Sequence, residues 1–169
     1  MKKIILTLAI ALFSVATFAQ KYAYVDTDYI LKNIPEYITA QKNLDDLSEK
    51  WEADVESKKR VINKKYQQYQ AEELLLPEDM KKKKREEIFS LENGLSKFQQ
   101  DKFGVEGELF QKRKELIEPI QNKVYNAVKE LASVGNYSFI FDKANQSNIL
   151  YADSKLDKSQ RILKNLGYK

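Results

Sequence analysis

Two long stretches of the chain place apolar residues three and four positions apart among Lys, Glu and Gln, which is the pattern of an amphipathic helix. Between them lies Leu74-Leu75-Leu76-Pro77-Glu78-Asp79, the one place in this part of the chain with the residues of a turn. Pro35 lies 42 positions before Pro77, and Pro119 lies 42 positions after it. A fold back at Pro77 predicts an antiparallel helical hairpin over residues 36–118, roughly 60 Å long at 1.5 Å per residue.

Each arm of this hairpin carries an apolar seam whose spacing is close to the coiled-coil repeat. The first seam is Tyr37, Leu44, Leu47, Trp51, Val55, Ile62, Tyr66, Tyr69 and Leu76. The second is Ile88, Leu91, Leu95, Phe98, Val105, Leu109, Leu116, Ile120, Val124, Ala127, Leu131 and Val134. Lys58 and Glu73 occupy positions of the first seam where apolar residues are expected. The three leucines at the tip either cap the hairpin core or form a small exposed patch, and we expect at least one to cap it.

A second set of apolar residues lies one position beyond the second seam and shares one heptad position: Phe89, Phe103, Phe110 and Ile117. At 100° per residue this stripe faces away from the partner helix, and exposed apolar residues in register indicate a partner surface. The alternative is that they pack against the first helix or a neighbouring subunit. Phe89, Phe103 and Phe110 are therefore candidate binding residues.

The second arm also contains three glycines, Gly94, Gly104 and Gly107. Each glycine costs a helix interior about 1 kcal/mol relative to alanine, so three of them favour a stalk that can bend. Close backbone packing is the alternative. Pro119 is expected to kink this helix or to mark the point where the arm meets a body.

Short strands are predicted near both ends of the chain, at residues 22–25, 137–141 and 149–152. Asp26 and Asp28 are better explained as caps of a short helix through Ile34 than as a catalytic carboxylate pair. Asp157 similarly caps a last helix that Gly167 ends. Three strands have exposed edges and a thin core, so this body, residues 20–35 and 119–169, is expected to complete itself with further copies of the chain.

Residues 1–19 have the features of a signal peptide. Lys2 and Lys3 precede a short apolar run, and small residues stand at the positions that determine cleavage, which predicts a cut after Ala19. The mature chain, residues 20–169, is then a single exported unit, located in the periplasm of a bacterium. Since no Cys follows the cut, a lipid-anchored product is not expected.

Composition excludes several classes of function. The chain has no Cys and no His, so thiol nucleophiles, zinc–thiolate sites and the commonest general base are missing. Without Lys2 and Lys3 the chain has 27 basic and 25 acidic residues, an excess too small to indicate a nucleic-acid binder. Glycoside hydrolysis by two carboxylates remains possible in principle. The carboxylates are spread along solvated helices, however, so we expect no enzyme, no cofactor and no metal site.

One basic run follows the turn: Lys81, Lys82, Lys83, Lys84 and Arg85. It could contact anionic lipid headgroups. The alternative is an ordinary solvated helix face, because Glu78, Asp79, Glu86 and Glu87 flank the run. This charge balance favours the solvated face.

The chain resembles the Skp/OmpH family of periplasmic chaperones of outer-membrane proteins. The resemblance rests on the exported start, on Tyr22-Ala23-Tyr24-Val25-Asp26, on the long charged hairpin, and on Phe139-Ile140-Phe141-Asp142-Lys143-Ala144 with Ile149-Leu150-Tyr151-Ala152-Asp153. It implies a mainly α chain with a small β body: a homotrimer in which a short-stranded β-barrel carries three coiled-coil tentacles.

The resemblance also implies a function. The tentacles of the family enclose unfolded outer-membrane proteins without ATP and prevent their aggregation. A lipopolysaccharide site built from basic tentacle residues has been proposed in the family, and residues 81–85 are the candidate here. A structural coiled-coil adaptor or spacer of the cell envelope is the alternative function, since it would share the hairpin but need no exposed apolar stripe.

Overall fold

The computed structural model describes residues 20–144 and 149–168, so the predicted signal peptide lies outside the described residues. The described chain is mainly α-helical with a small two-stranded sheet. It divides into two compact units, which are treated separately below. The arm unit is Leu31–Lys123, and the base unit combines the described residues of Met1–Ile30 and Val124–Lys169.

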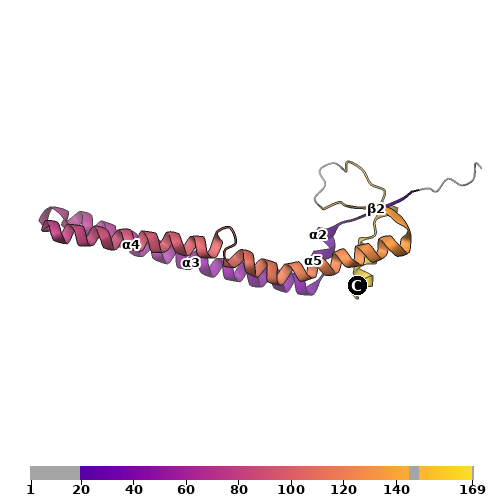
Figure 1. Ribbon diagram of the computed structural model, residues 1–169, viewed down its shortest axis with the longest axis horizontal. Coiled ribbons are helices and arrows are strands. Elements are labelled where there is room, and N and C mark those ends of the chain that lie inside the picture. The colour runs from indigo at the N-terminus through magenta and orange to yellow at the C-terminus, as the bar shows by residue number, and fades with distance from the viewer. Residues whose placement is uncertain (1–19, 145–148, 169) are drawn as a thin grey trace, which may run out of the picture. The chain divides into compact units, whose positions relative to one another are not determined.

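The arm unit is built on two helices that run side by side (Figure 1). Helix α3, Pro35–Glu72, has 38 residues and begins with its proline, whose fixed φ suits the first turn. A short 3₁₀ turn, η1 (Glu73–Leu75), and extended backbone at Pro77 reverse the chain. Helix α4, Glu78–Phe103, then returns along α3, with two carboxylates in its first turn that suit the positive end of the helix dipole.

The seam between α3 and α4 contains most of the residues that the apolar pattern predicted. Ile62, Tyr69 and Ile88 form a buried cluster against which Leu91 and Leu95 pack. Further along α3, the buried residues are Ala40, Leu44, Trp51 and Val55. Tyr66 was expected in the seam but is half exposed. The seam steps seven residues from Ile62 to Tyr69, which leaves Tyr66 on its flank.

The apolar pattern predicted one continuous helix for the second arm, but the structure shows two. Residues 104–107 interrupt it between α4 and α5, Glu108–Gly135 (Figure 1). A Cβ on Gly104 would lie 2.4 Å from the carbonyl oxygen of Gln100, and one on Gly107 would lie 2.9 Å from that of Gly104. Glu106 has a positive φ of 62°. These two glycines therefore allow close backbone packing, the alternative to a simple bending point.

Two side chains at or after the interruption differ from the predicted pattern. Val105 was expected in the seam and is fully exposed, whereas Ile117 was expected in the outer stripe and is buried. Val105 lies among the non-helical residues, where a heptad count does not apply. Ile117 adds to the apolar face of α5 that Ile120, Val124, Ala127 and Leu131 form, and these four are buried as predicted. Helix α5 continues through Pro119. It ends at Gly135, after which Asn136 takes a left-handed conformation, and Val134, expected in the seam, is mostly exposed.

The base unit centres on two parallel strands, β1 (Lys21–Val25) and β2 (Tyr137–Asp142). After β1, Asp26 accepts a 2.9 Å hydrogen bond from the backbone N–H of Tyr29 and so caps α2, Thr27–Lys32, as predicted. Asp157, predicted to cap the last helix, lies one residue before the N-cap, Lys158. It still accepts a hydrogen bond of 2.8 Å from the N–H of Ser159, where α6 (Ser159–Asn165) begins after the short turn η2 (Ser154–Leu156). Buried apolar residues of this unit are Ala23, Tyr24, Val25, Ile30, Val124, Ala127, Leu131, Ile162 and Leu163.

The strand predicted at residues 149–152 is absent from the described sheet, which has only two strands. Leu150 and Tyr151 are almost fully exposed, at 98% and 85%. The outer edge of β1 is already occupied, because the N–H of Lys158 donates to the carbonyl of Tyr24 at 2.9 Å and Asp157 forms a bridge with the same residue. The segment has the side chains of a strand but joins neither strand of this sheet.

Asp142 connects the end of β2 to the start of α2. Its two carboxylate oxygens accept hydrogen bonds from the Thr27 N–H (3.1 Å) and from the Thr27 hydroxyl (2.6 Å). The N–H of Ala144 also donates to it, at 3.1 Å. These bonds fix the junction between the strand and the helix.

We expect Asp142→Ala to lower the free energy of unfolding by about 1–3 kcal/mol, because it leaves the part-buried groups of Thr27 without their acceptor. Urea unfolding followed by circular dichroism measures this change. Asp153→Ala is the matched control, since Asp153 accepts one exposed bond from the Lys155 N–H and its loss costs less. Equal effects of the two variants would contradict a special role for Asp142.

Candidate functional site

The three candidate binding residues lie at separate points along the arm unit. Phe89 on α4 is 65% exposed. Phe103, at the end of α4, is 37% exposed and meets Trp51 edge-on, with ring centroids 6.0 Å apart. Phe110 on α5 is 52% exposed and lines a groove of about 380 Å³ with Tyr37. Phe89 and Phe103 are about 21 Å apart along the helix at 1.5 Å per residue, so the stripe is a series of contacts and not one pocket.

The exposed apolar surface of the arm is larger than the predicted stripe. Leu74 and Leu75 in the tip turn are 96% and 86% exposed, while Leu76 is partly buried and can cap the hairpin core. Other exposed apolar side chains of the arm are Ile38, Val61, Tyr66, Met80 and Val105. The seam pattern does not predict Ile38 and Val61 as surface residues. Their signal was available, since both are apolar residues outside the heptad positions.

A cation–aromatic cluster spans the interruption between α4 and α5. The Lys102 ammonium lies 4.7 Å from the ring centroid of Trp51 and 5.9 Å from that of Phe98. It also forms an ion pair with Glu108, the first residue of α5. Lys102 thus connects the two sides of the interruption while its ammonium covers the rings of the seam.

The basic run at residues 81–85 is largely compensated within the arm. Lys81 pairs with Glu78 at 2.8 Å, Lys84 with Glu72 at 2.6 Å and Lys82 with Glu86 at 4.0 Å. The hydrogen bond from Lys81 lowers the pKa of the Glu78 carboxyl. The same bond raises the pKa of Lys81. These neighbours reduce the positive charge that the run offers to a ligand.

The base unit has its own exposed aromatic face on the sheet. The rings of Tyr22 and Phe139 stack with centroids 6.0 Å apart, and those of Phe139 and Phe141 with centroids 6.2 Å apart. The three residues are 43%, 56% and 46% exposed. A two-stranded sheet is marginal by itself, so this face and the open edge of β2 suit contacts with further strands.

Within the described residues, no cluster of carboxylates forms a metal site. Helices long enough to span a bilayer are all too polar to do so in the described part of the chain. The surfaces that remain are the apolar points of the arm and the aromatic face of the base.

A family model described as "Outer membrane protein (OmpH-like)" matches residues 21–166, and the chain therefore belongs to the OmpH-like family. This is a family of periplasmic chaperones for outer-membrane proteins, not of enzymes. The fold is also similar to a crystal structure from Caulobacter crescentus CB15 described as a candidate outer membrane chaperone (OmpH-like). That match has a TM-score of 0.67 at 8% identity and covers 88% of this chain and 84% of the other. A comparison with curated proteins finds no match.

The cluster around Lys102 leads to a prediction with a built-in reporter, because Trp51 is the only tryptophan. Lys102→Met removes both the cation over Trp51 and the ion pair with Glu108. We expect a shift in the tryptophan emission and a loss of about 0.5–2 kcal/mol in the free energy of unfolding. Lys97→Met, at an exposed position of the same helix, is the control. An unchanged emission spectrum would mean that Lys102 does not interact with Trp51 in solution.

Proposed function

We propose that this protein is an ATP-independent holdase that binds unfolded outer-membrane proteins in the periplasm and prevents their aggregation. Residues 1–19 direct its export and are removed after Ala19. The observation that carries the proposal is the series of exposed aromatic side chains on the arm. A soluble helical hairpin does not need large apolar residues facing water, and their presence along one arm indicates a partner.

The spacing of these residues suits a client without a fold. An unfolded barrel precursor presents apolar side chains along an extended chain, so many separate contacts serve it better than one deep pocket. Each contact is weak, but linked contacts raise the total affinity by effective concentration. We assign client contact to Phe89, Phe103 and Phe110.

We further propose that three copies assemble through the base unit, so that three arms surround one client. The exposed rings of Tyr22, Phe139 and Phe141 and the open edge of β2 support this assembly. Leu150 and Tyr151 support it too, because they lie in a β-prone segment that has no place in the sheet of a single chain. Neighbouring copies would cover these side chains in a closed β body.

Light scattering of the mature protein, alone and with a urea-unfolded outer-membrane barrel protein, tests both proposals. We expect a trimer that forms a discrete soluble complex with the client. A stable oligomer that leaves the client to aggregate would favour the structural adaptor of the envelope. A folded monomer would contradict the proposed assembly.

The residue assignment makes a separate prediction. Replacing Phe89, Phe103 and Phe110 together by Ser should weaken client binding roughly tenfold, since three contacts of about 0.5 kcal/mol each amount to one order of magnitude. Fluorescence titration with a labelled client measures this. The control replaces the exposed Glu92, Gln99 and Asn122 by Ser, which tests the loss of helix propensity without removing aromatic rings.

Phe103 needs its own comparison because it contacts Trp51. The double variant Phe89→Ser/Phe110→Ser leaves that contact intact and should retain the oligomer and most of its stability. Unchanged suppression of client aggregation by the triple variant would refute the assignment of these residues.

We also propose that the tip makes a weak contact with lipid. Leu74 and Leu75 support this, because they are almost fully exposed beside the run of Lys81, Lys82, Lys83, Lys84 and Arg85. Apolar side chains that enter the headgroup region, with lysines at its surface, are typical of interfacial binding. The ion pairs of the run make the leucines the larger contribution.

Co-sedimentation with vesicles tests the lipid contact. We expect the double variant Leu74→Ser/Leu75→Ser to lose most binding, and phosphatidylglycerol or lipopolysaccharide to strengthen wild-type binding only modestly over phosphatidylcholine. Ile38→Ser, an exposed apolar position away from the tip, is the control. Equal sedimentation of the wild type and the leucine variant would exclude this role of the tip.

A further inference from the structure

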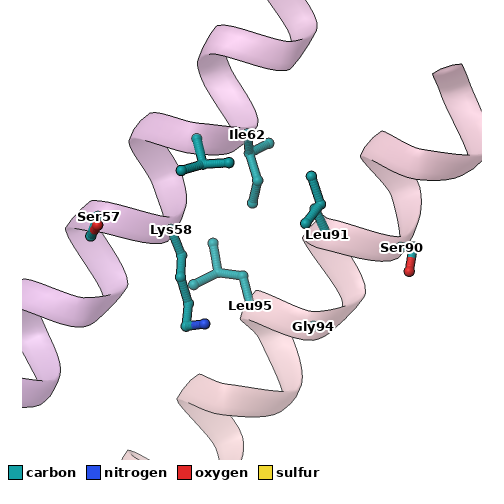
Figure 2. A pocket seen from close by; sticks show the side chains of 8 residues that line it. Ser57, Lys58, Ile62, Ser90, Leu91, Gly94 and Leu95 are labelled. Atoms are coloured by element: carbon teal, nitrogen blue, oxygen red, sulfur yellow. The ribbon is translucent and has the colours of Figure 1, made fainter.

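A groove of about 320 Å³ opens between α3 and α4 in the arm unit (Figure 2). Ile62 from α3 and Leu91 and Leu95 from α4 point toward one another and line it. Ser57 and Ser90 also line it, one from each helix. The groove is therefore apolar inside with hydroxyl groups available nearby. Its volume is at the lower end of the range of ligand sites, which suits a single large side chain.

Gly94 is one reason that the groove is open. A Cβ built on this residue would meet nothing within 4 Å, so no neighbour requires a glycine there. Its backbone is helical and has no positive φ that would require one either. Glycine destabilises a helix interior relative to alanine. The missing side chain thus weakens the helix without a gain in packing, and its visible effect is to leave the groove unfilled.

Lys58 is the second reason, and it lines the groove from α3. It occupies a seam position where the heptad pattern expects an apolar residue. Its ammonium lies 5.2 Å from the ring centroid of Phe98. Among the ion pairs of the described residues, none involves Lys58, whereas Lys59 pairs with Glu56 and Lys65 with Glu87. The charge of Lys58 is therefore not neutralised by a carboxylate of the arm.

We propose that this groove is a subsite for one large apolar side chain of an extended client segment, with Lys58 meeting a carboxylate on the same segment. The assignment rests on the proposed holdase function and adds a specific contact to it. Strands of outer-membrane barrels alternate apolar and polar residues. Each apolar residue of such a segment has polar neighbours in the chain. Because an unfolded segment is not held in a strand, a neighbouring carboxylate can turn toward Lys58, whose charge no carboxylate of the arm neutralises.

Methyl NMR of the mature protein, labelled at Leu and Val, tests the groove directly. The probe is a capped peptide of alternating apolar and polar residues that contains one Phe and one Asp. We expect the methyl signals of Val61, Leu91 and Leu95 to shift on titration. Replacing the Asp of the peptide by Asn should weaken binding to the wild type about threefold, with no such difference for Lys58→Gln.

Gly94→Leu fills the groove and should weaken peptide binding roughly tenfold, since a fully buried side chain is lost from the complex. Its thermal midpoint should not fall, because the helix gains a better helix former in open space. Asn93→Leu is the matched control: it adds the same side chain one position away, at an exposed site that does not line the groove. This control should bind the peptide as the wild type does.

The outcomes separate the groove from the holdase function. Shifts that disappear in Gly94→Leu and persist in Asn93→Leu support the subsite. A wild type that binds the whole client but shows no methyl shifts with the peptide keeps the holdase function and overturns the subsite. A wild type that binds the peptide in the groove but leaves the whole client to aggregate keeps the subsite and overturns the holdase function. Wild-type affinity in Gly94→Leu overturns the subsite in either case.

Discussion

The packing of α3 against α4 is the interaction on which the arm depends. A helix of 38 residues with so many charges gains little stability from propensity alone, so the apolar face must be buried against another helix. Ile62, Tyr69 and Ile88 form the buried cluster of that contact. Two helices have only one shared seam, and every side chain outside it therefore faces water. Most side chains of the arm are therefore exposed to solvent, and these exposed side chains decide what the arm can bind.

Two places in the arm depart from ideal helix packing, and both affect its exposed surface. At residues 104–107 the helix gives way to close backbone contacts, and Lys102 with its aromatic neighbours joins the two sides. Lys58 and Gly94 supply no apolar side chain to the contact between α3 and α4, and a groove lies beside them. Each departure adds exposed apolar or cationic surface, Val105 at the first and Lys58 at the second. The proposed binding of an unfolded chain by many weak contacts requires exposed surface of this kind.

The base unit also combines a small buried core with exposed apolar side chains, here on a sheet and short helices. Two parallel strands and the ends of α5 and α6 bury a small core, while Phe139 and Phe141 remain half exposed on the sheet. Hydrogen bonds that the carboxylates of Asp26, Asp142 and Asp157 accept fix the turns between the elements and so set the direction of each element. Membership in the OmpH-like family accounts for this combination of a small β base with a long helical arm.

The sequence by itself determined the long helices, the reversal at Pro77, the cap at Asp26, and the family, because periodicity, capping and turn residues act locally. It missed what depends on contacts across the fold. The predicted seam was wrong at Val105, because close backbone packing of Gly104 and Gly107 interrupts the helix there, and Ile117 is buried beside seam residues that the pattern predicted correctly. Residues 149–152 did not form a strand, since a strand needs a partner edge. The same holds for the residues of the candidate site. The apolar pattern predicted that Phe89 faces outward, whereas only the tertiary structure placed Lys58 and Gly94 around one groove.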